Sequence, residues 1–478
     1  MPATKRKKNR KQPKNRASSP PSPPQKTQKS DKHILSLPFE VIAQIFTLVD
    51  PTNPFATFSL RRICRLVNHY LVSEYFVSLY LSCSPPSYSD DFGLSLFDRF
   101  FFSPAAPASF QLEYADRVLK IQKGKSFYSD RIWAYVTPSI LPPAIGRITQ
   151  LTTLCLKGMH LQGNVPMEME LLVNLKVLDL SKNRLSGTLD AFADMQSLTD
   201  LCIQKNEFTG ILPANHRWMN LKMLSVSHNR LTGGLGPCFN MLNRDIELIY
   251  CNSNLFTGDV PDLREFSNLY HLFLNNNCLT GELPPFCEGM NLRVLVLTAN
   301  ELSGSIEGLG WEFLHHLTKL DLAENLFMGS IPRELGSLSR LEDLNLHWNS
   351  FENPIPNELG SLANLIHLKL SQNNLEGPVP IPLARLSKLR FLQLDHNFFS
   401  GTIPQEFSDS LSKNLSLLAL NHNNLEGPLP NGMGRWGVKR LFLKGNQRLK
   451  GERIPADVRP KSKMWQLLRE NGFEKYRT

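Results

Sequence analysis

The sequence predicts an α/β repeat solenoid that is preceded by a small helical domain. Three observations lead to this prediction: thirteen copies of one short pattern between about residues 151 and 455, a basic tail at residues 1–32, and an amphipathic helical segment after the tail. Repeats with a period of about 20–29 residues are typical of solenoids, because each unit buries its apolar face only against its neighbours.

The copy at residues 341–356, LEDLNLHWNSFENPIP, shows the pattern most clearly. Alternating Leu344 and Leu346 predict a short strand with both leucines pointing inward. We expect the following Asn349 to turn inward and bond the backbone groups that the bend leaves unpaired. Asparagines recur at this position every 23 to 26 residues, with Met159 in their place in the first copy: Asn183, Asn206, Asn229, Asn254, Asn277, Asn300, Asn325, Asn349, Asn373, Asn397, Asn423 and Asn446.

Most copies continue as LxGxIP, as in FSGTIP at residues 399–404. Glycine allows a positive φ, and proline suits an edge or turn that needs no donor. The whole pattern resembles the plant-type leucine-rich repeat. This resemblance implies a right-handed horseshoe with a concave parallel sheet and short strands or 3₁₀ segments on the convex side. It covers about two thirds of the chain and predicts the fold, whereas function does not follow from a fold.

The net charge of +10 is concentrated in the tail. Residues 1–32 hold eleven of the 53 basic residues and one of the 43 acidic ones, so the remainder carries 42 of each. We therefore expect no specific nucleic-acid binding. The tail is predicted to be disordered. Its cluster resembles a nuclear-localisation signal, although a solvated basic tail is an equal alternative: Lys5, Arg6, Lys7 and Lys8.

The eight cysteines form no CxxC pair and are predicted to be free thiols that pack as small apolar residues. A signal peptide is not recognised at the start, and no apolar run of about 18 residues is available to cross a membrane. These features predict a cytoplasmic or nuclear protein without membrane contact.

Residues 33–81 are predicted to form a small helical domain. It combines an LPxE start at residues 37–40, an IF pair at 45–46, VDP at 49–51 and RxxCR at 61–65. These residues resemble an F-box, although residues 67–69 lack the tryptophan that many members carry. The resemblance implies docking on a Skp-type adaptor of a cullin ubiquitin ligase, whereas a plain helical cap is the alternative. The implied adaptor contacts are Leu37, Pro38, Glu40, Val41, Ile45, Phe46, Pro51, Ile63 and Cys64.

Three further segments complete the predicted organisation. Residues 82–150 form a linker and an N-terminal helical cap, with helices at 112–121 and 127–136. The solenoid follows at residues 151–455, and a cap helix closes its last coil within residues 456–478.

Recognition is a better expectation than catalysis. The sequence holds no P-loop, GxSxG, HExxH or kinase-type set, so we predict no enzyme and no cofactor. His396 and His422 lack a third and fourth ligand, so no metal site is expected. Residues flanking the inward leucines line the concave face, where clustered aromatics are candidate anchors for an unknown protein target. One group comprises Tyr250, Tyr270, His271 and Phe273, and a second comprises His347, Trp348, His367, Phe391, His396 and His422.

These features predict a non-catalytic interaction adaptor, in which the F-box-like helices bind the ligase and the concave face holds the target. The alternative is an intracellular repeat scaffold or signalling protein, cytoplasmic or nuclear, without a ligase link.

Overall fold

The computed structural model describes residues 101–104, 106, 108–119, 126–128, 139–408, 414–449 and 454–473. All of them lie in the unit His69–Thr478. The F-box-like domain and the basic tail, predicted at residues 1–81, lie outside the described residues.

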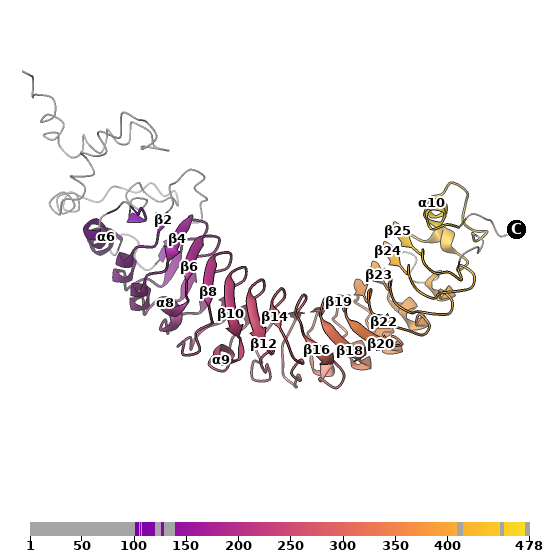
Figure 1. The fold of residues 1–478 in the computed structure, drawn as a ribbon, viewed down its shortest axis with the longest axis horizontal. Helices are drawn as coiled ribbons and strands as arrows, with labels where there is room; N and C mark the ends of the chain where they lie inside the picture. The colour runs from indigo at the N-terminus through magenta and orange to yellow at the C-terminus, as the bar shows by residue number, and fades with distance from the viewer. Residues whose placement is uncertain are drawn as a thin grey trace, which may run out of the picture. The chain divides into compact units, whose positions relative to one another are not determined.

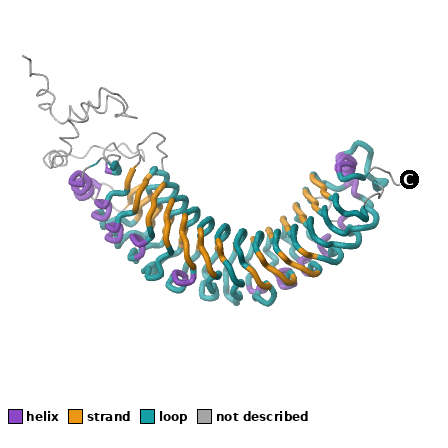
Figure 2. The backbone as a smooth tube through the Cα atoms, in the orientation of Figure 1, coloured by secondary structure: helices purple, strands orange, loops and turns teal. Residues whose placement is uncertain are grey.

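The described part of this unit is a solenoid whose coils are stacked along an arc (Figure 1). Each coil contributes one strand to a long parallel sheet on the inner side of the arc, and short helices lie on its outer side (Figure 2). This confirms the predicted leucine-rich-repeat horseshoe. The long sheet runs through β1 (Ser126–Tyr128), β3 (Thr153–Cys155), β5 (Val177–Asp179), β7 (Asp200–Cys202), β9 (Met223–Ser225), β11 (Leu248–Tyr250), β13 (His271–Phe273), β15 (Val294–Val296), β17 (Lys319–Asp321), β19 (Asp343–Asn345), β21 (His367–Lys369), β23 (Phe391–Gln393), β24 (Leu417–Ala419) and β25 (Arg440–Phe442).

Two smaller parallel sheets follow the bend of each coil. The first comprises β2 (Ser139–Ile140), β4 (Leu161–Asn164), β6 (Arg184–Gly187), β8 (Glu207–Gly210), β10 (Arg230–Gly234), β12 (Leu255–Gly258) and β14 (Cys278–Leu279). The second comprises β16 (Ser303–Ser305), β18 (Leu326–Ser330), β20 (Ser350–Asn353) and β22 (Asn374–Leu375). The glycine of the LxGxIP pattern holds a positive φ angle in these strands, as Gly187 and Gly329 do, at 87° and 79°.

Short helices return the chain to the next coil. They are the 3₁₀ helices η2 (Pro143–Arg147), η3 (Met167–Leu171), η4 (Trp311–Phe313), η5 (Arg333–Ser337), η6 (Asn357–Ser361), η7 (Ile381–Arg385), η8 (Gln405–Ser408) and η10 (Met433–Arg435), and the α-helices α8 (Asp190–Ala193) and α9 (Gly236–Phe239). Most of the 3₁₀ helices follow a proline, whose fixed φ suits the helix start.

The N-terminal cap differs from the prediction. Helix α6 (Ala108–Tyr114) and the π-helical turn η1 (Ala115–Leu119) agree with the first predicted helix. The second prediction is wrong at its start, because Phe127 lies in strand β1 (Ser126–Tyr128), which pairs with β3. Phe127 is fully buried and packs edge-on against Phe102, so its aromatic ring extends the core to the first strand.

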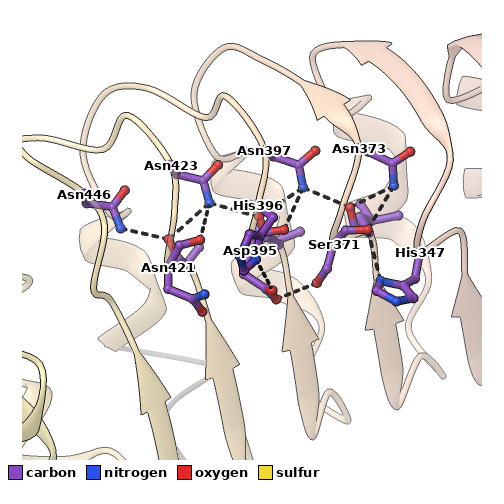
Figure 3. Close-up of polar contacts among 12 residues, drawn as sticks. His347, Ser371, Asn373, Asp395, His396, Asn397, Asn421, Asn423 and Asn446 are labelled. Carbon is purple, nitrogen blue, oxygen red and sulfur yellow. Dashed lines mark hydrogen bonds and ion pairs between the residues drawn. The ribbon is translucent and has the colours of Figure 1, made fainter.

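The predicted asparagine ladder is confirmed in all twelve coils that carry it. Asn206 is representative: its Nδ2 donates to the carbonyls of Ile203 in its own coil and Leu180 in the preceding coil, each at 3.0 Å. Its Oδ1 accepts from the Leu185 amide at 3.0 Å. Figure 3 shows the same arrangement from Asn373 to Asn446. Each ladder asparagine therefore joins two coils by hydrogen bonds to backbone amides and carbonyls that have no partner in the sheet at the bend.

The residue before each ladder asparagine is held in the left-handed region. From Lys182 to His422 these residues have φ between 54° and 60°, although none is glycine. That conformation costs an L-residue about 1–2 kcal/mol. Its amide donates to the next coil, as Lys205 does to the Ser227 carbonyl at 2.9 Å, so coil stacking maintains the strained backbone.

The C-terminal helix α10 (Lys463–Glu470) lies after the last strand of the long sheet, β25. The residue after this helix has a function that the sequence did not predict. Asn471 accepts from the Leu443 amide at 2.7 Å and donates to the Leu441 carbonyl at 2.8 Å. Its side-chain amide thus takes the place of a further strand at the edge of β25.

Replacing a ladder asparagine should destabilise the array much more than replacing its exposed neighbour. Asn373→Ala removes bonds to the carbonyls of Leu346 and Leu370 and to the Phe351 amide, all buried. We expect unfolding to become easier by about 3 kcal/mol, because several buried polar groups lose their partners. The matched control, Asn374→Ala, alters an exposed side chain one residue later. Equal shifts in urea denaturation for both variants would contradict this role of the ladder.

His216 should make stability fall in acid. Its ring is 2 % exposed, accepts from the Trp218 amide at Nδ1 and bonds the Cys238 carbonyl through Nε2. Burial lowers the pKa of His216 from 6.5, and the hydrogen bond to Cys238 only partly opposes this. Below pH 6.5 the unfolded chain therefore binds more protons, so the unfolding free energy decreases as the pH falls.

Denaturation at pH 8 and pH 5 checks this prediction. His216→Gln should reduce the difference between the two pH values, even though it loses the ring stacked on Trp218 at 4.3 Å. An unchanged difference would show that the pH dependence comes from other groups.

Candidate functional site

The concave face is formed by residues that flank the inward leucines of the long sheet. In β13, Leu272 points into the core, whereas His271 and Phe273 stay half-buried on the face. The register aligns equivalent positions of neighbouring strands, which lie about 4.8 Å apart. A side chain on this face therefore contacts residues 21–26 positions away in the sequence more readily than its chain neighbours.

Tyr250, His271 and Phe273, which we call the aromatic patch, form one cluster on β11 and β13. The Tyr250 hydroxyl lies 3.0 Å from His271 Nδ1, within hydrogen-bonding distance. The rings of Tyr250 and Phe273 are 5.2 Å apart and tilted by 33°. His271 meets Phe273 edge-on at 6.3 Å. The hydrogen bond fixes the relative orientation of the rings, so the patch is preorganised for an apolar ligand group.

Tyr270, predicted as part of the same group, makes a different contact. The Arg293 guanidinium lies over its ring at 4.9 Å from the centroid. This cation–π pair lies at the margin of the aromatic patch, because Tyr270 immediately precedes β13.

Four apolar residues that the sequence did not single out extend the aromatic patch. Met223 and Leu248 align with His271 on one side, and Val294 aligns with it on the other. Val296 aligns with Phe273. The sequence could have identified these residues, because they occupy the same positions of the repeat as His271 and Phe273. Together, the aromatic patch and these four residues form an apolar zone across strands β9 to β15.

The burial of this zone keeps its titratable groups neutral. Burial raises the pKa of Tyr250 above 10.0. Burial lowers the pKa of His271 below 6.5, and the positive charge of Arg293 adds to the effect. The aromatic patch therefore carries no charge at neutral pH, which favours apolar contacts.

The second predicted group does not form one patch. His367 and Phe391 pack together on β21 and β23 with ring centroids 4.9 Å apart. Burial lowers the pKa of His367, although the nearby Asp343 acts in the opposite direction. The other four residues follow their strands and lie at the bend, so they are separated from this pair.

At the bend, His347 packs beside Trp348 at 5.7 Å, and His396 stacks on His422 at 4.4 Å. Trp348 is 59 % exposed at a φ of 58°. Residues before the other ladder asparagines share this φ, so the exposure of Trp348, and not its backbone, makes it a candidate contact residue. Gly445 continues the His396–His422 row, where a Cβ would lie 2.7 Å from the His422 ring. A side chain at position 445 would collide with His422, so the row of rings ends at this glycine.

A polar network joins these bends (Figure 3). Ser371 donates to Asp395 at 2.5 Å, and Asp395 lies 2.9 Å from His396 Nδ1. His347 Nδ1 lies 3.1 Å from the Ser371 carbonyl. With His396 held by Asp395, the two stacked histidines make an ordered polar ridge.

An acid–lysine cluster on β17 and β19 was also missed. Lys319 Nζ lies 3.2 Å from Asp343 and 3.9 Å from Asp321. Thr298 donates to Asp321 at 2.5 Å. This cluster separates the apolar zone from the strands that follow it.

The remaining predicted sites lie outside the described residues: the adaptor contacts from Leu37 to Cys64 and the basic residues Lys5 to Lys8. In the part of the chain that the structure describes, no three His, Cys, Asp or Glu residues are grouped to hold a metal ion. No helix there is long and apolar enough to cross a membrane. The six described cysteines are free.

Comparison with known proteins supports the repeat assignment. The family described as Leucine Rich Repeat matches residues 174–195, 220–242, 268–290, 316–338, 340–362 and 388–410. Receptor-like protein 41 and Receptor-like protein 39 of Arabidopsis thaliana are 35 % and 32 % identical over 142 residues. Each match covers 28 % of this chain but only 16 % of the relative.

Two solved structures are also similar. The crystal structure of PEPR1-AtPEP1 has a TM-score of 0.57 and 27 % identity, covering 66 % of this chain and 48 % of that one. A TDR receptor has a TM-score of 0.54 and 26 % identity, covering 67 % and 63 %. This chain thus matches less than two thirds of each relative.

These matches contradict the predicted cytoplasmic or nuclear location, because the relatives are receptor-like proteins and receptors. The prediction depended on the absence of a recognised signal peptide and of an apolar run long enough to cross a membrane. Such an absence does not locate a protein. The segments that match the family lie between residues 174 and 410 and do not include the F-box-like residues. The asparagine ladder, the parallel sheet and the matched segments together identify the coils as leucine-rich repeats of the plant type.

Proposed function

We propose that this chain is a non-catalytic recognition protein that holds a peptide segment of a partner on its concave face. The aromatic patch carries this proposal. Its rings form a preorganised apolar surface at the centre of a concave sheet, where a partner segment can be surrounded on several sides. The similarity to PEPR1-AtPEP1 and to a receptor supports a binding role.

The apolar zone favours a ligand with an aromatic or large aliphatic side chain. Met223, Leu248 and Val294 flank the aromatic patch, so such a side chain contacts apolar groups on neighbouring strands. The acid–lysine cluster at Lys319 bounds the zone and disfavours apolar groups beyond it. The ligand chemistry is therefore expected to change along the sheet.

The double variant Tyr250→Ala/Phe273→Ala should weaken ligand binding. Peptides selected from a displayed library on the intact chain serve as ligands. We expect their Kd to rise at least about tenfold, since buried aromatic anchors contribute about 2 kcal/mol or more.

Phe398→Ala is the matched control, because Phe398 is an aromatic residue that is 55 % exposed and lies outside the long sheet. Unchanged affinity in the double variant, with normal folding, would exclude the aromatic patch as the anchor.

A finer proposal is that the F-box-like segment recruits a Skp-type adaptor and a cullin ligase to the bound partner. It depends only on the sequence pattern of residues 37–65. Co-purification with a Skp-type adaptor tests it, with Leu37→Ala/Pro38→Ala/Ile45→Ala expected to abolish the association. Failure of the unmodified chain to bind the adaptor would remove this proposal without affecting the concave face.

A further inference from the structure

The C-terminal end of the concave face carries four exposed cations, Arg390, Lys439, Arg440 and Lys444, which we call the basic surface. Backbone bonds join Arg390 to Ser416 and Ser416 to Lys439, each at 2.8 Å, so these three residues form one row across the strands. Arg440 lies in the neighbouring row, in register with Leu417. Two strand intervals separate Arg390 from Lys439, a distance of about 10 Å.

None of these four cations forms an ion pair with a carboxylate of the described residues. Two cations elsewhere on the face are paired, unlike these four: Lys222 lies 2.9 Å from Glu247, and Lys319 lies 3.2 Å from Asp343. Asp395 occupies the position in its coil that Lys444 occupies in a later one, so it is the carboxylate to consider as a partner. Its side chain already contacts Ser371 and His396. The basic surface therefore keeps uncompensated positive charge on the concave side.

Apolar side chains lie between the cations. Phe391 and Leu417 are half-buried in register with Arg440, and Phe442 is 44 % exposed at the next outward position of β25. Neighbouring apolar groups reduce the water around a bound anion and strengthen its attraction to the cations. The combination suits an extended peptide that carries both acidic and apolar residues, because its carboxylates can pair with the cations while its apolar side chains contact Phe391, Leu417 or Phe442.

We propose that the basic surface binds an acidic, extended segment of the same partner that the aromatic patch anchors. This inference rests on the proposed function and adds the chemistry of a second ligand segment and its spacing from the first. Six strand intervals separate β13 from β24, or about 29 Å. An extended chain spans that distance with about nine residues. The acidic segment therefore lies about nine residues from the apolar anchor.

A labelled eight-residue peptide of alternating Glu and Leu tests the basic surface in the full chain. The same peptide with Gln in place of Glu is the uncharged comparison. We expect the Glu peptide to bind at least tenfold more tightly than the Gln peptide, and added salt to weaken its binding. In the variant Lys439→Gln/Arg440→Gln, the Glu peptide should lose at least tenfold in affinity.

Arg385→Gln/Arg435→Gln is the matched control, since it removes two exposed cations from the 3₁₀ helices η7 and η10 and changes the net charge equally. All variants keep the basic tail at residues 1–32, so its contribution cancels between them. Retained affinity in the first variant, or an equal loss in both, would overturn the proposal.

Leucines of the probe that contact the aromatic patch do so equally in the Glu and the Gln peptide, so the difference between the two peptides reports only the charge of the basic surface. Loss of binding only in Lys439→Gln/Arg440→Gln supports the basic surface even if Tyr250→Ala/Phe273→Ala leaves selected ligands unaffected. The two proposals therefore fail separately.

Discussion

The structure depends on the pairing of backbone groups at one bend in each coil. The chain turns there after the second inward leucine, which leaves amides and carbonyls without strand partners in an apolar interior. A primary amide has donors and an acceptor on one short side chain, so Asn206 and its equivalents satisfy both kinds of group. Aspartate lacks the donors, and leucine lacks both. The parallel sheet, the left-handed residue before each asparagine and the spacing of the concave face all follow from this bend.

The sequence predicted the repeated part of the molecule well, because position within the coil determines burial. Leu272 and Leu274 are buried as their spacing requires, and Tyr250 and Phe273 meet because the register is regular. The cap was predicted less well, since a three-residue strand around Phe127 has no periodicity to recognise. Asn471 was missed for a related reason: its bonds join residues about 30 positions apart outside the repeat pattern.

The candidate site was predicted only in part. The second aromatic group was treated as continuous because its members lie in consecutive coils. His367 and Phe391 precede the bend, however, whereas His347, Trp348, His396 and His422 follow it. Apolar strand residues such as Met223 and Leu248 were overlooked, since such residues are usually assigned to the core. Their position between inward leucines distinguishes them from core residues. Charge pairing across strands, as between Lys319 and Asp343, depends on side-chain conformations that the pattern does not specify.

The cap formed by Asn471 has a consequence for how such an array changes in length. Its amide fits the edge of β25 and blocks the position that a following strand would need. A coil added after β25 would displace helix α10, whereas a coil duplicated between two existing coils would meet compatible surfaces on both sides. At this end of the sheet, the array can therefore lengthen only by duplication of a coil before β25. A duplication between the aromatic patch and the basic surface would move these two surfaces apart by one strand spacing while leaving both chemically intact.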